Sequence, residues 1–171
     1  MKLFVIMMLM TSLFAVGTCR ADALAEGDQL PEGLTSLNQD GNEVRLDDYR
    51  GKWLILYFYP KDDTPGCTRE AITFSGMVDE FEALNAVVLG ISTDSQKSHR
   101  KFIAKHDLKI QLLSDTEKVL TTLFDVKTTF GFCSRDTMLI NPEGKVEKVY
   151  RGVSPEGNPK DILSYIQGAV K

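Results

Sequence analysis

The longest apolar segments of this chain contain almost no alternating polar positions. Residues 53–59 (WLILYFY), 86–91 (AVVLGI) and 110–113 (IQLL) are apolar nearly throughout and are bounded by polar or turn-forming residues. Strands covered on both faces of a sheet have this pattern, whereas half-exposed strands alternate. We therefore predict three buried strands, with residues 53–59 at the centre of the sheet.

Shorter segments predict a hairpin near each end of the domain. Residues 34–37 and 43–46 flank Asp40-Gly41, a dipeptide that suits the positive backbone angles of a tight turn, so the domain opens with a β-hairpin. Residues 137–140 and 145–150 flank the turn sequence NPEG, which predicts two further strands joined by a turn.

Four other segments have apolar residues at helical spacing. The first helix begins close to Cys67, and the third follows the sequence SDTE at 114–117, whose spacing fits a capping box. The last helix follows Asn158-Pro159, a cap and a first-turn proline. The apolar positions are Ala71, Phe74, Val78 and Phe81 in the first helix, Phe102 and Ile103 in the second, Val119, Leu120, Leu123 and Phe124 in the third, and Ile162, Leu163, Ile166 and Ala169 in the last.

The order of these elements predicts one α/β domain with a central mixed β-sheet, helices on both faces and an N-terminal β-hairpin. Alternating strands and helices in the first half imply right-handed crossovers between parallel strands, and the late hairpin adds antiparallel strands. Ligands of such sheets bind at the carboxyl ends of the strands. The loop over residues 60–67, which follows the central strand, is therefore where we predict a functional site.

The first residues have the pattern of a secretory signal peptide. Lys2 precedes an apolar segment over residues 3–16, and small residues then offer cleavage sites near 21–25. The apolar segment is shorter than the ~20 residues that a membrane-spanning helix needs. We predict a signal peptide over residues 1–23, a mature domain over residues 24–171 and export to a bacterial periplasm. Lipoprotein anchoring at Cys19 is the alternative.

Composition excludes several classes of partner. The chain has 20 Lys and Arg residues against 24 Asp and Glu residues, so nothing in its charge favours nucleic acid. Cysteines at 19, 67 and 133 are too few for a disulfide scaffold and too dispersed for a zinc site. His99 and His106 fall on the second predicted helix without a ligand pattern, and we interpret them as surface or packing residues. We expect no metal, no cofactor and no stable membrane partner.

The residues around Cys67 favour a reactive thiol. A thiol reacts as its thiolate, and the free amides and macrodipole of a helix N-terminus favour that anion. Thr64 precedes Cys67 across a turn stiffened by proline, so its hydroxyl can point to the same pocket, Gly66 permits close approach of a small substrate, and Arg69 adds positive charge. A buried, inert cysteine is the alternative, but the flanking glycine, threonine and charged residues disfavour it.

The segment from Pro60 to Cys67 fits the pattern P-x-x-x-T-x-x-C of peroxiredoxins, and YFYPKDDTPGCTREA resembles the peroxiredoxin Q (bacterioferritin comigratory protein) branch. The resemblance covers essentially the whole mature chain. It includes the opening hairpin, the segment LDDYRGKW, and Arg135-Asp136-Thr137 followed by a strand and NPEG, which resembles the arginine-bearing segment of that family.

This resemblance implies a thioredoxin-like fold and a thiol peroxidase that reduces hydrogen peroxide and organic hydroperoxides in antioxidant defence. Cys67 is then the peroxidatic residue, which becomes a sulfenic acid. Thr64 and Arg135 organise the peroxide, and Pro60 shields the pocket to which Gly66 also belongs. The partners implied are a peroxide and a thiol reductant, either a thioredoxin-like protein or a small thiol.

The sequence departs from many members of that branch at one position. They carry a resolving cysteine five residues after the peroxidatic cysteine, and Ile72 occupies that position here. Cys133 is the other thiol of the mature chain, and in an extended segment it points to the same side as Arg135. Its neighbours Phe130 and Phe132 favour a core cysteine. We therefore favour a one-cysteine cycle with an external thiol over resolution by Cys133, in a monomer or weak dimer.

Two other functions stay open on the sequence alone. An envelope thiol-disulfide oxidoreductase would share the fold and the compartment, but it normally needs C-x-x-C, and Glu70 occupies the place of the second cysteine. A non-catalytic holdase is the other, because a fold does not fix a function. Consumption of peroxide by the purified protein separates both from a peroxidase.

Overall fold

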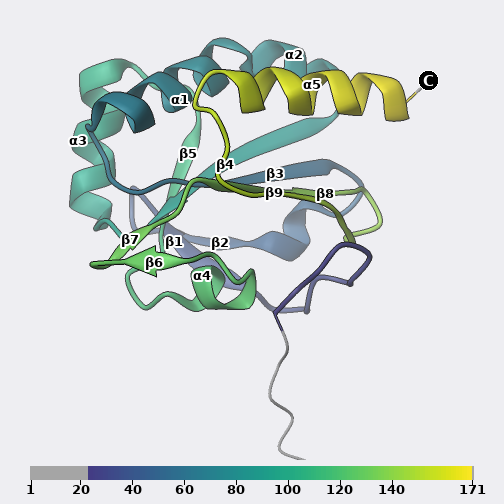
Figure 1. Cartoon of the computed structure of the whole chain (residues 1–171), viewed down its shortest axis with the longest axis horizontal. Helices are drawn as coiled ribbons and strands as arrows, with labels where there is room; N and C mark the ends of the chain where they lie inside the picture. The colour runs from purple at the N-terminus through teal and green to yellow at the C-terminus, as the bar shows by residue number, and fades with distance from the viewer. Residues whose placement is uncertain (1–22, 171) are drawn as a thin grey trace, which may run out of the picture.

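The computed structural model describes residues 23–170 as a layered α/β domain (Figure 1). Residues 1–22, which hold Cys19 and nearly all of the predicted signal peptide, lie outside this described part. No helix within residues 23–170 is long and apolar enough to cross a membrane. The elements in chain order are β1 (Thr35–Asn38), β2 (Glu43–Arg45), the 3-10 helix η1 (Leu46–Tyr49), β3 (Trp53–Phe58), α1 (Pro65–Gly76), α2 (Val78–Ala83), β4 (Ala86–Ser92), α3 (Gln96–His106), β5 (Gln111–Ser114), α4 (Val119–Leu123), β6 (Thr128–Thr129), β7 (Phe132–Cys133), β8 (Asp136–Ile140), β9 (Val146–Tyr150) and α5 (Gly157–Ala169).

A mixed seven-stranded sheet is the centre of the domain, with the strand order β2-β1-β5-β4-β3-β8-β9. β3 pairs in parallel with β4 and antiparallel with β8, and β4 pairs in parallel with β5. All six residues of β3 are buried, which confirms the prediction of a central strand covered on both faces. The opening hairpin is confirmed too, and Gly41 in its turn has the positive φ (82°) that favours glycine.

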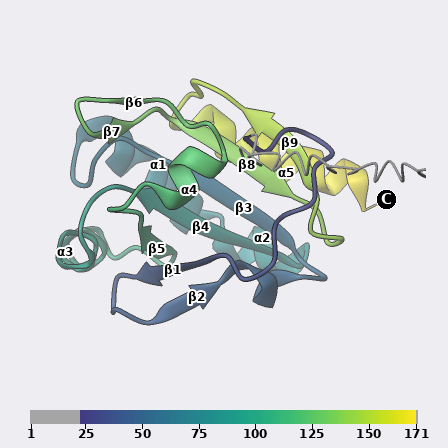
Figure 2. The ribbon, with the colours of Figure 1, turned by 90° about the horizontal axis from the view of Figure 1, so that it is seen from below.

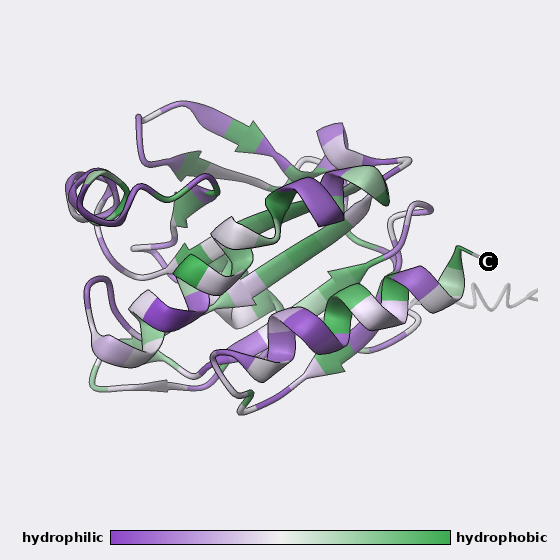
Figure 3. Cartoon of the chain, turned by 90° about the horizontal axis from the view of Figure 1, so that it is seen from above, coloured by the Kyte–Doolittle hydropathy of each residue, from purple (hydrophilic) through white to green (hydrophobic). Residues whose placement is uncertain are grey.

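Each face of the sheet has its own apolar core. The odd-numbered residues of β3 pack against α1, α2 and α5, and the even-numbered residues pack toward α4 and the segment before β1. Figure 1 shows α1, α2 and α5 above the sheet, and Figure 2 shows α4 and the β6–β7 hairpin across its lower face. In Figure 3 the central strands are apolar along most of their length beneath α1 and α5. The predicted layers are therefore confirmed.

The first predicted helix is divided into two. Its apolar spacing continued from residue 71 to residue 81, yet α1 ends at Gly76 and α2 begins at Val78. Met77 between them leaves the helical region (φ −105°, ψ 7°). Glycine is a poor helix former, and its position at the end of α1 accounts for a break that apolar periodicity does not reveal.

The capping of two predicted helices differs from the prediction. The short helix expected after residues 114–117 is confirmed as α4, but instead of a capping box the Asp115 carboxylate accepts hydrogen bonds from the amides of Leu120 and Thr121 (3.1 and 2.8 Å). α5 begins at Gly157, so Asn158 lies inside the helix and accepts a hydrogen bond from the Thr137 hydroxyl (2.7 Å) rather than capping it. In the second case a partner distant in sequence overrides the local capping signal.

Candidate active site

The loop after β3 places Cys67 in the first turn of α1. Cys67 is the third residue of this helix and is buried, with 2% of its surface exposed. The amides of Gly66 and Cys67 lie within the first turn, where helical residues have no intrahelical acceptor, and among residues 23–170 no backbone carbonyl accepts from them. These amides and the helix macrodipole favour negative charge at the sulfur.

The pairing of β3 with β8 brings Arg135 to Cys67. Phe58 at the end of β3 lies opposite Asp136, so Arg135 lies just beyond the paired strands, beside the loop that leads to α1. Its Nη2 donates a hydrogen bond to Cys67 Sγ (3.3 Å). Burial acts to lower the pKa of Arg135, but the negative charges of Glu70 and Cys67 raise it above its ordinary value. A permanent cation therefore lies against the sulfur and stabilises its thiolate.

Gly66 leaves the space that the Arg135 side chain occupies. A β-carbon at residue 66 would lie 3.1 Å from Arg135 Nη2, which is closer than ordinary van der Waals contact. Arg69, which we expected to add charge near Cys67, instead pairs with Glu156 at the surface (3.0 Å), and 57% of its side chain is exposed. Arg135 is therefore the guanidinium that contacts the sulfur, and the expectation for Arg69 was wrong.

Thr64 is the N-cap residue of α1, and Pro60 is half-buried at the start of the loop. Thr64 Oγ1 donates a hydrogen bond to the Lys61 carbonyl (2.9 Å). Because a hydroxyl has one hydrogen, the oxygen of Thr64 keeps only its acceptor capacity for a ligand of this site. The roles that the sequence predicted for Pro60, Thr64 and Gly66 toward a peroxide stay predictions.

Glu70 is a site residue that we did not predict from the sequence. Its carboxylate is fully buried and pairs with Arg135 Nη1, while its Oε1 has no hydrogen-bond partner among the described residues. Burial raises the pKa of Glu70 to about 8, although the charge of Arg135 acts in the opposite direction. The Arg135 guanidinium therefore lies between the buried acid and Cys67 and contacts both.

The raised pKa of Glu70 predicts a pH-dependent stability difference for Glu70→Gln. Native Glu70 holds its proton up to about pH 8, whereas the unfolded chain loses it near the ordinary value of 4.5. Between these limits the native state binds more protons, so the contribution of Glu70 to the free energy of unfolding falls as the pH rises. We expect the glutamine variant to gain stability relative to the wild type between pH 5 and pH 8. Urea unfolding at both pH values measures this difference; a constant difference would show that native Glu70 ionises normally.

Cys133 lies on the other face of the sheet from Cys67. Cys67 belongs to the core with the odd-numbered residues of β3, and Cys133 belongs to the core with the even-numbered ones. Its sulfur lies 3.6 Å from Thr121 Oγ1, and burial raises the pKa of its thiol. The expectation that Cys133 points to the same side as Arg135 was wrong, because β7 ends at Cys133 and residues 134–135 do not continue the strand.

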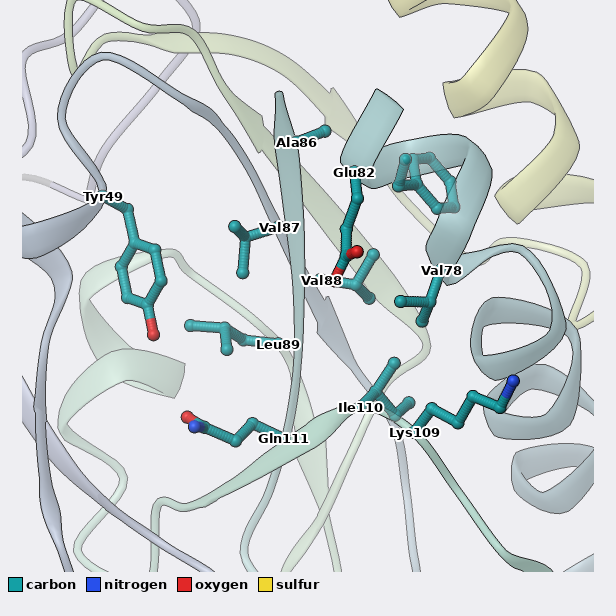
Figure 4. A pocket seen from close by; sticks show the side chains of 11 residues that line it. Tyr49, Val78, Glu82, Ala86, Val87, Val88, Leu89, Lys109, Ile110 and Gln111 are labelled. Carbon is teal, nitrogen blue, oxygen red and sulfur yellow. The ribbon is translucent and has the colours of Figure 1, made fainter. Parts of the chain in front are cut away.

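A cavity of about 180 Å³ between α2, β4 and the start of β5 lies apart from this site (Figure 4). Its lining is mainly apolar, with Tyr49 on one side and Val78 and Ile110 on the other, and Cys67 is not among the lining residues. None of the groups that surround Cys67 contributes to it. The chemistry of this chain is therefore placed at the end of β3 rather than in this cavity.

Comparison with known proteins agrees with the arrangement around Cys67. Residues 27–149 match the model of the AhpC/TSA family. The chain is 41% identical over 148 residues to peroxiredoxin Bcp of Bacillus subtilis, covering 82% of this chain and 94% of the relative. It is 35% identical over 143 residues to the chloroplastic peroxiredoxin Q of Gentiana triflora, covering 82% of this chain and 66% of the relative.

Solved structures give the same result. A mutant of peroxiredoxin Q from Xylella fastidiosa superposes with a TM-score of 0.83 at 33% identity, over 88% of this chain and 99% of its own. The bacterioferritin comigratory protein of Xanthomonas campestris, described with trapped intermediate and ligand complexes in alkyl peroxide reduction, superposes with a TM-score of 0.79 at 35% identity, over 86% of this chain and all of its own. The chain therefore belongs to the AhpC/TSA family, in its peroxiredoxin Q (bacterioferritin comigratory protein) branch, and has the thioredoxin-like fold of that family.

Proposed function

We propose that this peroxiredoxin reduces hydrogen peroxide and organic hydroperoxides with Cys67 as its nucleophile, and serves in antioxidant defence. The observation that carries the proposal is the hydrogen bond from Arg135 Nη2 to a sulfur at the N-terminus of a helix. A thiol peroxidase needs a thiolate beside groups that stabilise a leaving oxygen anion, and both conditions meet at Cys67. Reduction of alkyl peroxide by the similar protein of Xanthomonas campestris supports the substrate class.

The first step is the attack of the Cys67 thiolate on one oxygen of the peroxide, in line with the O–O bond. A sulfur–oxygen bond forms, the O–O bond breaks, and the distal oxygen leaves with the electron pair and takes up a proton to become water or an alcohol. Arg135 and the amides of Gly66 and Cys67 stabilise the charge that develops on this oxygen. Cys67 is thereby oxidised to a sulfenic acid.

Thr64 completes the site by accepting a hydrogen bond from the peroxide. Its hydroxyl hydrogen is held by the Lys61 carbonyl (2.9 Å), so its oxygen presents lone pairs to an incoming O–H group. A hydroperoxide has such an O–H group and a disulfide has none. This acceptor therefore favours a peroxide over a disulfide as the oxidant of Cys67.

Thr64→Val is expected to slow the reaction of Cys67 with peroxide because valine keeps the shape but offers no acceptor. A lost hydrogen bond is worth about 1 kcal/mol or somewhat more, so we expect a decrease on the order of tenfold. Stopped-flow oxidation of the reduced protein measures the rate. Thr64→Ser, which retains the hydroxyl, is the matched control and should react nearly as fast as the wild type; equal rates for serine and valine would remove Thr64 from the site.

An external thiol resolves the sulfenic acid in this proposal. Ile72, at the position of the resolving cysteine of many relatives, has no thiol and is 48% exposed. Cys133 is buried on the opposite face of the sheet, and reaching Cys67 would require local unfolding. A reductant thiol can instead attack the sulfenic acid to release water and form a mixed disulfide, which a second thiol reduces. A thioredoxin-like protein or a small thiol fits this role. The peroxiredoxin itself acts as a monomer or weak dimer in this proposal.

Cys133→Ala is expected to leave peroxide turnover with an external thiol nearly unchanged. The substitution removes a thiol that lies away from Cys67, and its cost falls on the stability of the core, not on the catalytic cycle. Steady-state turnover and non-reducing peptide mapping after one equivalent of peroxide measure the outcome. A stoichiometric disulfide between Cys67 and Cys133 in the wild type, with turnover lost in the alanine variant, would make Cys133 the resolving residue.

Export to the periplasm is part of the proposal and rests on the sequence pattern of residues 1–23. Mass determination of the mature chain from fractionated cells tests it. An N-terminus near residues 21–25 in the periplasmic fraction supports cleavage by a signal peptidase, and a lipid-modified Cys19 in the membrane fraction would support anchoring instead.

A further inference from the structure

A buried polar cluster lies beneath the loop that leads to Cys67, and the mechanism above does not use it. It consists of Tyr59, which directly follows β3, Asp62 in the loop and His99 on α3. Tyr59 and His99 are fully buried, and Asp62 is 7% exposed. Our interpretation of His99 as a surface or packing residue did not anticipate such a partner, because Asp62 is 37 residues away in the sequence.

The hydrogen bonds of this cluster place one proton between His99 and Asp62. His99 Nε2 lies 3.2 Å from the Leu113 carbonyl, which can only accept, so Nε2 carries a hydrogen. His99 Nδ1 lies 2.9 Å from Asp62 Oδ2, and the Tyr59 hydroxyl donates to Asp62 Oδ1 (2.8 Å). Two bare lone pairs would repel at this distance. A hydrogen bond therefore joins Nδ1 to the Asp62 carboxylate. Both ring nitrogens of His99 and both carboxylate oxygens of Asp62 then have hydrogen-bond partners.

The contact between His99 and Asp62 fixes the loop that leads to Cys67. Asp62 lies two residues before Thr64, the N-cap of α1, and its backbone amide donates to Asp94 Oδ2 (2.8 Å), which also accepts from Ser92 (2.9 Å). The loop is thus attached through its backbone to the end of β4 and through its side chain to α3. Without the contact to His99, a buried carboxylate would lose a partner, and the loop would have to move to solvate it.

We propose that His99 is a positioning residue of the peroxide reaction, which holds Asp62 and thereby the amides of Gly66 and Cys67 in their reactive places. The inference rests on the proposed function of Cys67. A shift of the order of 1 Å at a reacting centre can cost roughly 10²-fold in rate, so a residue that never touches the peroxide can still control the reaction.

Two substitutions at this position separate positioning from packing. An asparagine amide reaches approximately the place of Nδ1 and can donate to Asp62, whereas a glutamine amide reaches the place of Nε2 and can donate to Leu113. Each variant loses one of the two hydrogen bonds. We expect His99→Gln to slow the oxidation of Cys67 by on the order of 10²-fold and His99→Asn to recover most of the rate. Melting temperatures of both variants report the loss of stability separately.

His106 supplies a matched control on the same helix. It also faces a loop carboxylate, with Nε2 2.8 Å from Asp63 Oδ1, but 45% of the Asp63 side chain is exposed and Lys105 contacts the same carboxylate (2.6 Å). Exposed pairs of this kind contribute little because solvent screens them. His106→Gln should therefore react with peroxide at nearly the wild-type rate.

Backbone NMR keeps this test distinct from the test of the proposed function. We expect the amide resonances of Gly66 and Cys67 to shift in His99→Gln and to stay near their wild-type positions in His99→Asn. Unshifted amides together with a wild-type rate in His99→Gln would overturn the positioning role, as would equal slowing of both His99 variants in proportion to lost stability. A wild-type Cys67 that does not react with peroxide would overturn the proposed function, and the amide shifts would still show whether His99 holds the loop.

Discussion

Cys67→Ser is expected to abolish peroxide reduction while the fold persists. Serine replaces the sulfur with an oxygen of similar shape in a buried position, so the packing of α1 against the sheet changes little. Its hydroxyl is a far weaker acid and a weaker nucleophile than a thiol, so serine offers no reactive anion to the peroxide. Peroxide consumption in the presence of a small thiol measures the loss, and circular dichroism and thermal unfolding report on the fold.

Cys133→Ser is the control for this experiment because it removes the other cysteine of the described chain. Turnover in that variant with background rates in Cys67→Ser would assign the reaction to one thiol. Undiminished turnover in Cys67→Ser, with the fold intact, would refute the assignment of Cys67 and require another nucleophile.

Arg135→Met is expected to slow the oxidation of Cys67 by ~10²-fold to 10³-fold. The substitution removes the donor to Sγ and the only cation that the structure places against the sulfur within residues 23–170. It also leaves Glu70 buried without its partner, which favours the protonated acid further and costs stability. Stopped-flow measurement of the second-order rate constant measures the slowing, and thermal unfolding reports the loss of stability separately.

Two further variants serve as controls for Arg135→Met. Arg135→Lys keeps the charge but lacks the planar fork that contacts Glu70 and Cys67 together, so we expect a rate between those of the methionine variant and the wild type. Arg69→Met removes an exposed guanidinium that pairs with Glu156, so its rate should stay close to the wild type. Slowing in Arg69→Met equal to that in Arg135→Met would mean that general positive charge, not the contact at the sulfur, controls the reaction.

The fold was largely predictable because its central elements have simple apolar patterns. Residues 53–59 are apolar without alternation, and a strand buried on both faces explains this pattern directly. The parts that differed depend on contacts distant in sequence or on very short elements. Asn158 bonds to Thr137 instead of capping α5, and β6 and β7 have two residues each, too few for periodicity to appear.

The residues of the site were predictable where they belong to the peroxiredoxin motif or to the arginine-bearing segment. Cys67 and Arg135 meet as the resemblance implied, although 68 residues separate them, because β8 pairs with β3. Glu70 was missed because we considered it only as the residue in place of the second cysteine of C-x-x-C. It shares the spacing of the buried residues of α1 (67, 70, 71, 74 and 75), so a charge on an apolar stripe was the available signal. The partnership of Asp62 with His99 has no local signal at all.

The role of Cys67 as the peroxidatic thiol is tested most directly by the mass of the intact reduced protein after one equivalent of hydrogen peroxide, with and without a sulfenic-acid reagent. We expect one adduct of the reagent per chain, mapped to the peptide that contains Cys67, and release of the free thiol when a reductant is added first. An unmodified Cys67 after the peroxide has been consumed, or an adduct that maps to Cys133, would contradict this role.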